Sequence, residues 1–285
     1  MSIRIYLAAF VYINGISAWS CDEHKVISLI ASQLISRKTR KYINDHLPRI
    51  PGSKMNDYES ALVQAACWAD FEVDKYPWSA ELHFVHTPYR NCQPYNEGRD
   101  CGFGGSGRCL VTAIANYSMR AADFNLPSHQ VTEALKFLIH FMGDIHQPLH
   151  AGFAQDAGAT GIPLSPRGIS LHALWDSYLL DYWNIERRKW FKIGFALGEE
   201  MRRNRPSKFT MHVRNSGRFA SEIVSKITSE ITCKFAYSDE RYLERWDTVS
   251  LEYMKSRSNI AINLLKEAGV NLAIMLDAIA VSFSS

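Results

Sequence analysis

The chain has 285 residues, of which 47% are hydrophobic and 21% charged, with a formal net charge of +3. This composition is that of a globular protein with a substantial core, built as one large domain or two small ones. This net charge is too small to indicate a nucleic-acid partner by itself.

Residues 1–18 are typical of a secretory signal peptide. Arg4 supplies a basic start, residues 5–13 form a short apolar run, and Ala18 is a small residue at the cleavage position. The run is too short to span a membrane. A buried N-terminal strand is the alternative, but the cysteines that follow favour the signal. We therefore predict a mature chain, 19–285, that is secreted or lumenal (extracellular, cell-surface, or in a lysosome- or vacuole-like compartment).

Most long segments have the three- and four-residue apolar spacing of helices. The segments are 61–67, 131–146, 171–183, 219–235 and 251–281. Pro127 is typical of the start of the second helix and Pro148 of its end. Turn-forming residues predict loops at 88–108 and 152–168, and three cysteines in the first loop predict that it is pinned.

The C-terminal stretch 270–283 is apolar enough to raise the alternative of a membrane anchor. Asn271 and Asp277 interrupt it, and an Asp at the centre of a bilayer costs about 3 kcal/mol. A helix buried in the core is therefore the better prediction, with no stable membrane anchor.

The cysteine content indicates an oxidising compartment. There are six: Cys21, Cys67, Cys92, Cys101, Cys109 and Cys233. The even number and the absence of a Cys-x₂-Cys pair favour disulfides over zinc-finger ligation, and about 15 pairings stay open. Asn116-Tyr-Ser118 is a glycosylation sequon, which matters only in a secreted chain.

Two His–Asp pairs carry the strongest chemical signal. His140 and Asp144, and likewise His172 and Asp176, stand four residues apart, so on a helix each pair shares a face. Neutral imidazole and carboxylate are ligands that Zn²⁺ accepts. One pair is more often an ordinary hydrogen bond. Two pairs with a further His150 predict a zinc site with more than one metal.

Four residues upstream are weaker candidates for the same site. Taken singly, a buried Trp, His or Asp is more often structural. The candidates are Trp19, His24, Asp70 and His83. The other histidines are predicted to be structural, including His146, which lies two residues after Asp144 and so faces away from it. They are His46, His86, His129, His146 and His212.

Taken together, these residues give the chain a clear family resemblance. It resembles the class I single-strand-specific zinc nucleases of fungi and plants, which include a protozoan 3′-nucleotidase/nuclease branch. The resemblance covers nearly the whole mature chain and implies an all-α, single, mainly helical domain around a trinuclear zinc site, similar to phospholipase C and class I nucleases. The matching motifs are Trp19-x₄-His24, Trp68-Ala-Asp70, Leu82-His83-Phe84, Ala113-Ile-Ala-Asn-Tyr117, His140-x₃-Asp144-x₅-His150 and His172-x₃-Asp176.

The resemblance implies three zinc ions, with Asp144 bridging two of them. The third ion takes the α-amine of Trp19, a group that exists only after the signal peptide is removed. The ligand sets are Asp70, His83, His140 and Asp144 for the first ion, His150, His172 and Asp176 for the second, and Trp19, His24 and Asp144 for the third. The implied disulfides are Cys92–Cys233 and Cys101–Cys109, and with them Cys21–Cys67.

The implied activity is hydrolysis of single-stranded DNA and RNA to 5′-phosphate products, with 3′-nucleotides as further substrates. Water activated between metal ions is the nucleophile, so Asp70 and Asp144 belong to the catalytic machinery. Phe84 matches the family's base-stacking position, although a Phe is more often core. We expect a monomer.

Several positions depart from the family pattern. Val73 stands where a basic residue usually contacts the phosphate, and Lys75 is the nearest substitute. His86 replaces a base-contacting Asp, Gly158-Ala159-Thr160 replaces a Gly-Gly-Asn turn, and Ser170 replaces an Asn. These changes touch substrate selection and ligand support more than metal binding.

Two other functions stay open. Zinc-dependent phospholipase C has a similar fold and site, but its last ligand is Glu, whereas this chain has Asp176. A secreted, non-catalytic metal-binding or interaction protein on the same scaffold is suggested by Val73 and His86, although the complete ligand set argues against it. Base preference, DNA versus RNA preference, and the balance of endonuclease and 3′-nucleotidase activity are not predicted by the sequence.

Overall fold

The computed structural model describes residues 19–102, 107–164, 169–181, 189–204, 210–238 and 251–283, so the predicted signal peptide lies outside the described residues. The fold is all-α, as predicted, with extended pairing in the described ranges limited to isolated bridges at Thr87–Phe153 and Pro163–Ser170. The helices are α1 Cys21–Leu34, α2 Arg37–His46, α3 Asp57–Ala65, α4 Trp68–Phe71, α5 Glu97–Asp100, α6 Leu110–Ala122, α7 Ser128–Asp144, α8 Leu171–Ala173, α9 Leu179–Asp181, α10 Trp190–Arg203, α11 Ser216–Lys226 and α13 Leu251–Ser282. Short 3₁₀ segments are η1 Pro77–His83, η2 Pro148–Ala151, η3 Ala154–Asp156 and η6 Val213–Asn215, and π-helical turns are η4 Leu174–Tyr178 and η7 Ile227–Ala236.

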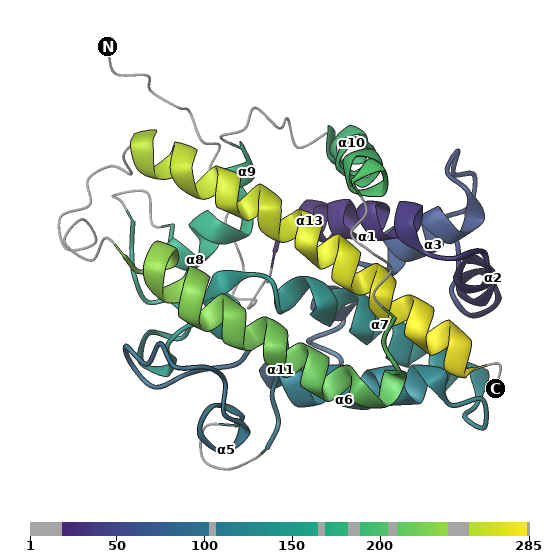
Figure 1. Ribbon diagram of the computed structural model, residues 1–285, viewed down its shortest axis with the longest axis horizontal. Helices are drawn as coiled ribbons and strands as arrows, with labels where there is room; N and C mark the ends of the chain where they lie inside the picture. The colour runs from purple at the N-terminus through teal and green to yellow at the C-terminus, as the bar shows by residue number, and fades with distance from the viewer. Residues whose placement is uncertain are drawn as a thin grey trace.

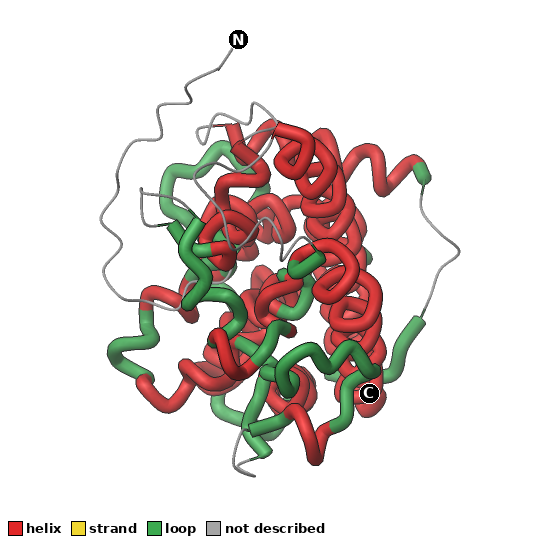
Figure 2. Tube along the Cα trace, turned by 90° about the vertical axis from the view of Figure 1, so that its left-hand side faces the viewer, coloured by secondary structure: helices red, strands yellow, loops and turns green. Residues whose placement is uncertain are grey.

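The helix α7 packs against α6, α13 and α1, whereas α10 packs on α1 and α11 packs on α6. The helix α13 crosses the molecule, with α11 along one side of it and α1 and α7 behind it (Figure 1). In the view from the side, the long helices stand together and the loops cover the other part of the molecule (Figure 2). Every residue of α7 from Phe137 to Asp144 is buried. The end of α7 that carries the predicted ligands His140 and Asp144 is therefore held rigidly in the core.

Glycines on two neighbouring helices let α1 pack closely. A Cβ on Gly269 of α13 would lie 2.4 Å from Cγ2 of Ile30, and one on Gly194 of α10 would lie 2.8 Å from Cβ of Leu29. Real Cβ atoms do not approach so closely without a shift of the backbone. These glycines fix the position of α1, and α1 carries the predicted ligand His24.

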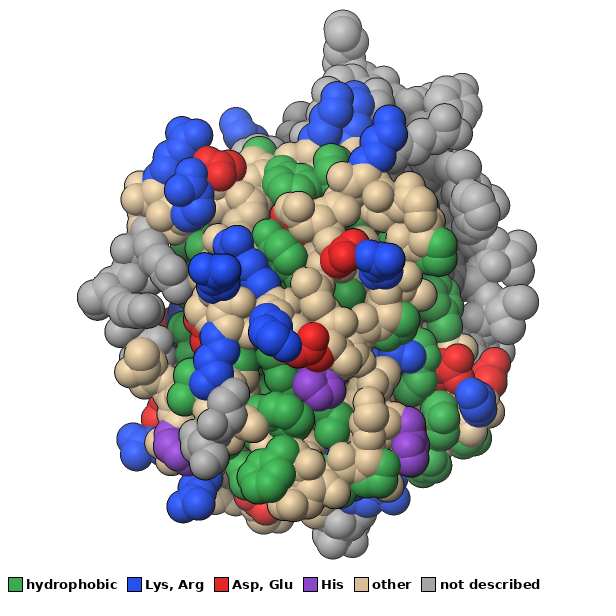
Figure 3. Space-filling view, turned by 90° about the vertical axis from the view of Figure 1, so that its right-hand side faces the viewer, with side chains coloured by type: hydrophobic (Ala, Val, Ile, Leu, Met, Phe, Trp, Pro, Cys, Tyr) green, Lys and Arg blue, Asp and Glu red, His purple; other side chains and the backbone are tan. Residues whose placement is uncertain are grey.

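The C-terminal helix is part of the core, as predicted. Leu272, Met275 and Ile279 of α13 are fully buried. Asp277 accepts a hydrogen bond from the backbone N–H of Ser36, at 2.9 Å, where α2 begins, and a carboxylate at a helix N-terminus is stabilising. Across the described part of the chain, no helix is both long and apolar enough to cross a bilayer. Lys and Arg side chains are spread over the face on which α2 lies (Figure 3).

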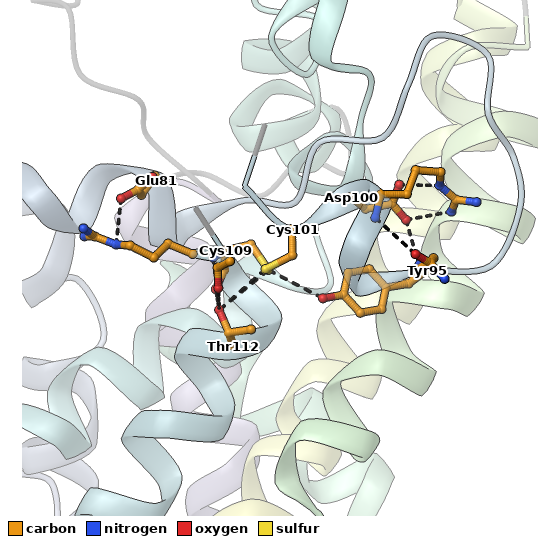
Figure 4. Close-up of a disulfide and its surroundings, with 10 residues drawn as sticks. Glu81, Tyr95, Asp100, Cys101, Cys109 and Thr112 are labelled. Atoms are coloured by element: carbon orange, nitrogen blue, oxygen red, sulfur yellow. Dashed lines mark hydrogen bonds and ion pairs between the residues drawn. A yellow bond between two sulfur atoms is a disulfide. The ribbon is translucent and has the colours of Figure 1, made fainter. Parts of the chain in front are cut away.

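Three disulfides tie the loops to the helices. They are Cys21–Cys67, Cys92–Cys233 and Cys101–Cys109, the pairing that the family resemblance implies. Cys21–Cys67 joins the first residue of α1 to the residue before α4. Cys101–Cys109 closes the loop before α6, where Thr112 accepts a hydrogen bond from the N–H of Cys109 and the hydroxyl of Tyr95 lies 3.7 Å from its sulfur (Figure 4). The described part of the loop 88–108 is thus pinned, as its cysteines predict.

Two predicted helices contain wide turns instead of regular helix. The segment 171–183 forms α8, the π-helical turn η4 and α9, with residues 182–183 outside the described ranges. The segment 219–235 continues from α11 into η7. Hydrophobic spacing cannot distinguish an α-helical turn from a π-helical one. The helix α7 ends at Asp144 rather than His146. The N–H groups of His146 and Gln147 bond carbonyls three residues back, and Pro148 has no N–H to continue the helix.

Candidate metal centre

Four of the predicted ligands meet where α4, η1 and α7 come together. Nε2 of His140 lies 3.1 Å from Oδ1 of Asp70, and Nδ1 of His83 lies 3.7 Å from the same oxygen. Asp144 completes the set, with Oδ2 at 3.0 Å from Nδ1 of His83 and 3.4 Å from Nε2 of His140. The structure thus brings together all four residues of the first predicted ligand set.

The two oxygens of Asp144 point to different partners. Oδ2 faces His83 and His140, whereas Oδ1 lies 3.2 Å from Nε2 of His24 on α1. The ring of His24 stacks on that of His140, with centroids 4.0 Å apart. A carboxylate placed between two groups of imidazoles in this way has the geometry of a bridge between two cations.

A second group lies on the segment after α7. His150, His172 and Asp176 each offer a ligand atom, and these atoms lie within 4.8 Å of one another. Nε2 of His172 is 3.4 Å from Oδ2 of Asp176. The structure therefore gathers the second predicted ligand set as well.

Trp19 lies at the start of α1 beside both groups. It is fully buried, and the next residue, Ser20, accepts a hydrogen bond from the N–H of His24 at 3.1 Å. The N–H of Ser20 donates to the carbonyl of Asp176 at 3.0 Å. The backbone at Trp19 is thus anchored one helical turn before His24 and directly against the second group.

The donor atoms fit a metal better than they fit one another. Nε2 of His83 and of His150 is buried and has no hydrogen-bond partner among the described residues, whereas Nε2 of His24 and of His140 lies against the carboxylates of Asp144 and Asp70. Buried polar atoms left without a partner are costly and rare. Ligand atoms that share a tetrahedral zinc with bonds of about 2.0–2.2 Å lie roughly 3.3–3.6 Å apart, which is close to the separations found here.

The second nitrogen of three histidine rings is held by a backbone carbonyl. Nδ1 of His140 lies 2.8 Å from the oxygen of Ala66, Nδ1 of His150 lies 2.6 Å from that of His83, and Nδ1 of His172 lies 2.7 Å from that of Gly158. A proton held on Nδ1 leaves Nε2 as the lone-pair donor. These supports come from segments distant in sequence, so no sequence signal could have found them.

The electrostatics of the site favour a bound cation. Burial lowers the pKa of His140, but the carboxylates of Asp144 and Asp70 outweigh burial and raise it to about 9. Burial is the largest cause that lowers the pKa of His150, to about 3, and the nearby His172 adds to it. Burial also raises the pKa of Asp176 well above its usual range, and the charges of Glu23, Asp70 and Asp144 act in the same direction. The first group therefore attracts positive charge, and in the second group a cation would offset the burial of the Asp176 carboxylate.

Two supporting residues were not predicted. Gln147 is fully buried, and its Nε2 donates to Oδ1 of Asp176, which orients the last predicted ligand. Gly143 leaves space for the ring of His24, because a Cβ at this position would lie 2.5 Å from its Nδ1. Both residues lie inside the His140–His150 motif, which is the only sequence signal that could have indicated them.

The predicted substrate contacts lie beside the first group. Phe84 and His86 are both half-buried, and their rings stack with centroids 4.2 Å apart. Burial, followed by the nearby His172, lowers the pKa of His86 to about 4, so His86 offers a neutral ring where the family has a carboxylate. The ammonium of Lys75 is exposed and lies 3.1 Å from Glu72.

The remaining departures act on the backbone of the second group. Ala159 adopts φ of +66°, a left-handed conformation that strains any residue other than glycine, in the position where the family has Gly. Its carbonyl accepts a hydrogen bond from the N–H of His172 at 3.4 Å. Ser170 caps α8 by accepting from the N–H of Ala173 at 3.1 Å. The Ser thus supplies a helix cap directly before ligand candidate His172.

The other histidines have structural contacts or lie on the surface, as predicted. His146 is fully buried between two hydrogen bonds, to the carbonyl of Met142 at 2.8 Å and to Nδ2 of Asn271 at 2.9 Å. His46 bonds the carbonyl of Tyr42, His212 accepts from the N–H of Arg214, and His129 is exposed.

Comparisons with known proteins agree with this geometry. The model of the S1/P1 nuclease family matches residues 19–281. Endonuclease 2 of Arabidopsis thaliana is 30% identical over 279 residues, which cover 93% of this chain and 91% of the plant protein. Nuclease P1 of Penicillium citrinum is 34% identical over 167 residues, covering 56% of this chain and 58% of the fungal protein. The chain therefore belongs to the S1/P1 nuclease family, and it is a nuclease that hydrolyses phosphodiester bonds.

Proposed function

We propose that the mature chain 19–285 is a secreted or lumenal, three-zinc nuclease that cleaves single-stranded DNA and RNA to 5′-phosphate products. The proposal includes 3′-nucleotidase activity, a monomeric state, removal of residues 1–18 and glycosylation at Asn116, which is exposed on α6. The observation that carries it is the carboxylate of Asp144 between His24 on one side and His83 and His140 on the other.

The proposed ligands are assigned to the three sets that the family resemblance implies, and His24 also lies within reach of Asp70 and His140. The ligand sets are Asp70, His83, His140 and Asp144 for the first zinc, His150, His172 and Asp176 for the second, and the α-amine of Trp19 with His24 and Asp144 for the third. The family match begins at Trp19, which supports this residue as the mature N-terminus.

Zinc at these positions would supply positive charge that lowers the pKa of water and offsets charge on the phosphate. The chain's own residues then orient the reaction. Asp144 holds the first and third positions at a fixed separation, and Gln147 aligns Asp176. Phe84 is the proposed platform for the base beside the cleaved bond, and a base locked in a duplex cannot stack there. Lys75 is the proposed cation for the phosphate, since its ion pair with Glu72 is on the surface and therefore weak.

The test combines metal analysis of the mature protein with product analysis on a short single-stranded oligonucleotide. We expect three zinc ions per chain and products that carry 5′-phosphates. A duplex of the same sequence is the control and should be cleaved far more slowly. Fewer than three zincs at full activity, or 3′-phosphate products, would contradict the proposal.

The same preparation separates the two alternative functions. Hydrolysis of phosphatidylcholine without cleavage of single-stranded RNA would identify a phospholipase C. A zinc-loaded protein that hydrolyses neither RNA nor 3′-nucleotides would support a binding role, for which Val73 in place of the usual basic residue is the supporting feature. Replacing Val73 by Arg in that case should restore activity if the missing cation is the cause.

A further inference from the structure

An aromatic surface lies beside the first proposed metal position. We define the aromatic ledge as Trp68, Tyr76 and Trp78, packed on the buried ring of Phe137. The ring centroids of Trp68 and Trp78 lie 5.1 and 5.8 Å from that of Phe137, and Tyr76 and Trp78 are 5.8 Å apart. Trp78 is 44% exposed, and Trp68 and Tyr76 are partly exposed. The ledge therefore presents ring surface to solvent on a rigid floor.

A cation lies over this surface. The ammonium of Lys136 is 4.7 Å from the centroid of the Trp68 ring, and that of Lys75 is 5.3 Å from the ring of Tyr76. Burial lowers the pKa of Lys136. Aromatic rings next to ammonium groups are the combination that binds single-stranded nucleic acid, since bases stack on the rings and phosphates meet the cations.

The ledge and the first ligand set share the same three elements. Trp68 precedes Asp70 by two residues on α4, Trp78 precedes His83 by five in η1, and Phe137 precedes His140 by three on α7. Three residues of α-helix rise about 4.5 Å, so the floor of the ledge is about one turn from a proposed ligand. The side chain of Asp70 is 15% exposed, whereas that of Asp144 is fully buried. The first group thus opens to solvent at α4, where the ledge begins.

We propose that the aromatic ledge is a second base-stacking subsite, which binds an unpaired base of the strand beyond the nucleotide held at Phe84. This inference rests on the proposed function. It predicts that the enzyme gains affinity from bases outside the cleaved linkage, and that Trp78 carries much of that gain. Lys136 contributes a phosphate contact that does not depend on the base.

The test compares three substrates: a thymidine dinucleotide, a thymidine hexanucleotide, and the same hexanucleotide with abasic residues at all but its two central positions. The two hexanucleotides have equal charge and differ only in flanking bases. Because stacking of a base on an aromatic ring strengthens binding, we expect the wild type to cleave the full hexanucleotide with a kcat/KM about tenfold higher than that for the abasic hexanucleotide. Trp78→Leu should reduce this preference to within about twofold, and Trp78→Phe should keep most of it. Hydrolysis of the dinucleotide should be unchanged in both variants.

Lys136→Met provides an independent arm if Trp78→Leu does not fold. It should lower kcat/KM equally for both hexanucleotides and leave hydrolysis of the dinucleotide unchanged. The slope of log kcat/KM for the hexanucleotides against log salt concentration should become shallower by about 1. The proposal that the ledge binds a base is overturned if Trp78→Leu folds and keeps the tenfold preference. It is also overturned if this variant loses the same activity on all three substrates. If the wild type cleaves none of the substrates, the proposed function has failed instead. In that case, binding of the two hexanucleotides, each carrying a fluorescent label, is measured by anisotropy. We expect the wild type to bind the full hexanucleotide more tightly than the abasic one, and Trp78→Leu to reduce this difference.

Discussion

Asp144 is the single residue on which two of the three proposed metal positions depend. Its Oδ1 faces His24, and its Oδ2 faces His83 and His140. Asp144→Asn keeps the size of the side chain but removes the anionic charge that two dications need between them. We expect it to be the most damaging ligand substitution, with loss of at least one zinc per chain and of nearly all activity on single-stranded RNA, measured with zinc supplied.

His146→Ala is the matched control for Asp144→Asn. It lies two residues away and is equally buried, but its partners are Met142 and Asn271. We expect it to keep the zinc content and most of the activity while losing about 1–3 kcal/mol of stability, because Asn271 is left without its buried partner. Circular dichroism verifies that both variants fold. Abolished turnover in His146→Ala with turnover preserved in Asp144→Asn would show that the assignment of this segment is wrong.

Trp19 is a proposed ligand through its α-amine, so the length of the N-terminus matters. One additional residue before Trp19 converts the amine into an amide without a lone pair for zinc. We expect such a protein to fold, because the buried Trp19 ring keeps its place in the hydrophobic core. We also expect it to lose the third zinc. Metal analysis and N-terminal sequencing measure this directly. Full activity with a mature N-terminus elsewhere would rule out the assignment.

The element that positions His24 is α1, and its packing depends on glycine. Gly269→Ala on α13 places a Cβ 2.4 Å from Cγ2 of Ile30 and 3.2 Å from the carbonyl of Ile27. The backbone carbonyl cannot move aside as a flexible side chain can. We expect a loss of about 1–3 kcal/mol in the free energy of unfolding by denaturant, with weaker retention of zinc.

Gly98→Ala is the control for this substitution. The nearest atom to a Cβ on Gly98 of α5 is Oδ1 of Asn96 at 3.6 Å, an ordinary contact. Alanine at such a helical position should stabilise by up to about 1 kcal/mol, since it restricts the unfolded chain. An equal effect of the two substitutions would show that the close packing of α1 and α13 is not what limits stability.

At the scale of the whole molecule, the proposed metals would join segments from the start of α1 to η4. The carboxyl groups of Asp144 and Asp176 are buried, and without a cation their charge must be balanced by a proton on a neighbouring imidazole or removed by protonation of the carboxyl itself. A ligand at 100 times its Kd stabilises by about 2.7 kcal/mol, so three zincs contribute on the order of 8 kcal/mol. We expect chelation to lower Tm by roughly 15–30 °C and added zinc to restore it, measured by calorimetry with metal analysis at each step. An unchanged Tm in protein shown to be metal-free would contradict this.

The all-α class and the buried C-terminal helix were predictable from the sequence, because apolar residues at helical spacing report which face is buried. The paired spacings of His140 with Asp144 and of His172 with Asp176 predicted donors on shared faces, since four residues make about one helical turn. The helix ends and the π-helical turns at 174–178 and 227–236 were not predictable, because the apolar pattern is the same for both kinds of turn.

Only the tertiary structure decided how the donors are divided and supported. That Asp144 turns one oxygen toward His24 and the other toward His83 depends on how α1 and η1 pack against α7, and residues far apart in the chain set that packing. The same holds for the carbonyls that hold the imidazole rings and for the aromatic ledge on Phe137. Sequence spacing reports what lies on one face of one element, whereas contacts between elements depend on crossing geometry and shape, which a linear pattern does not carry.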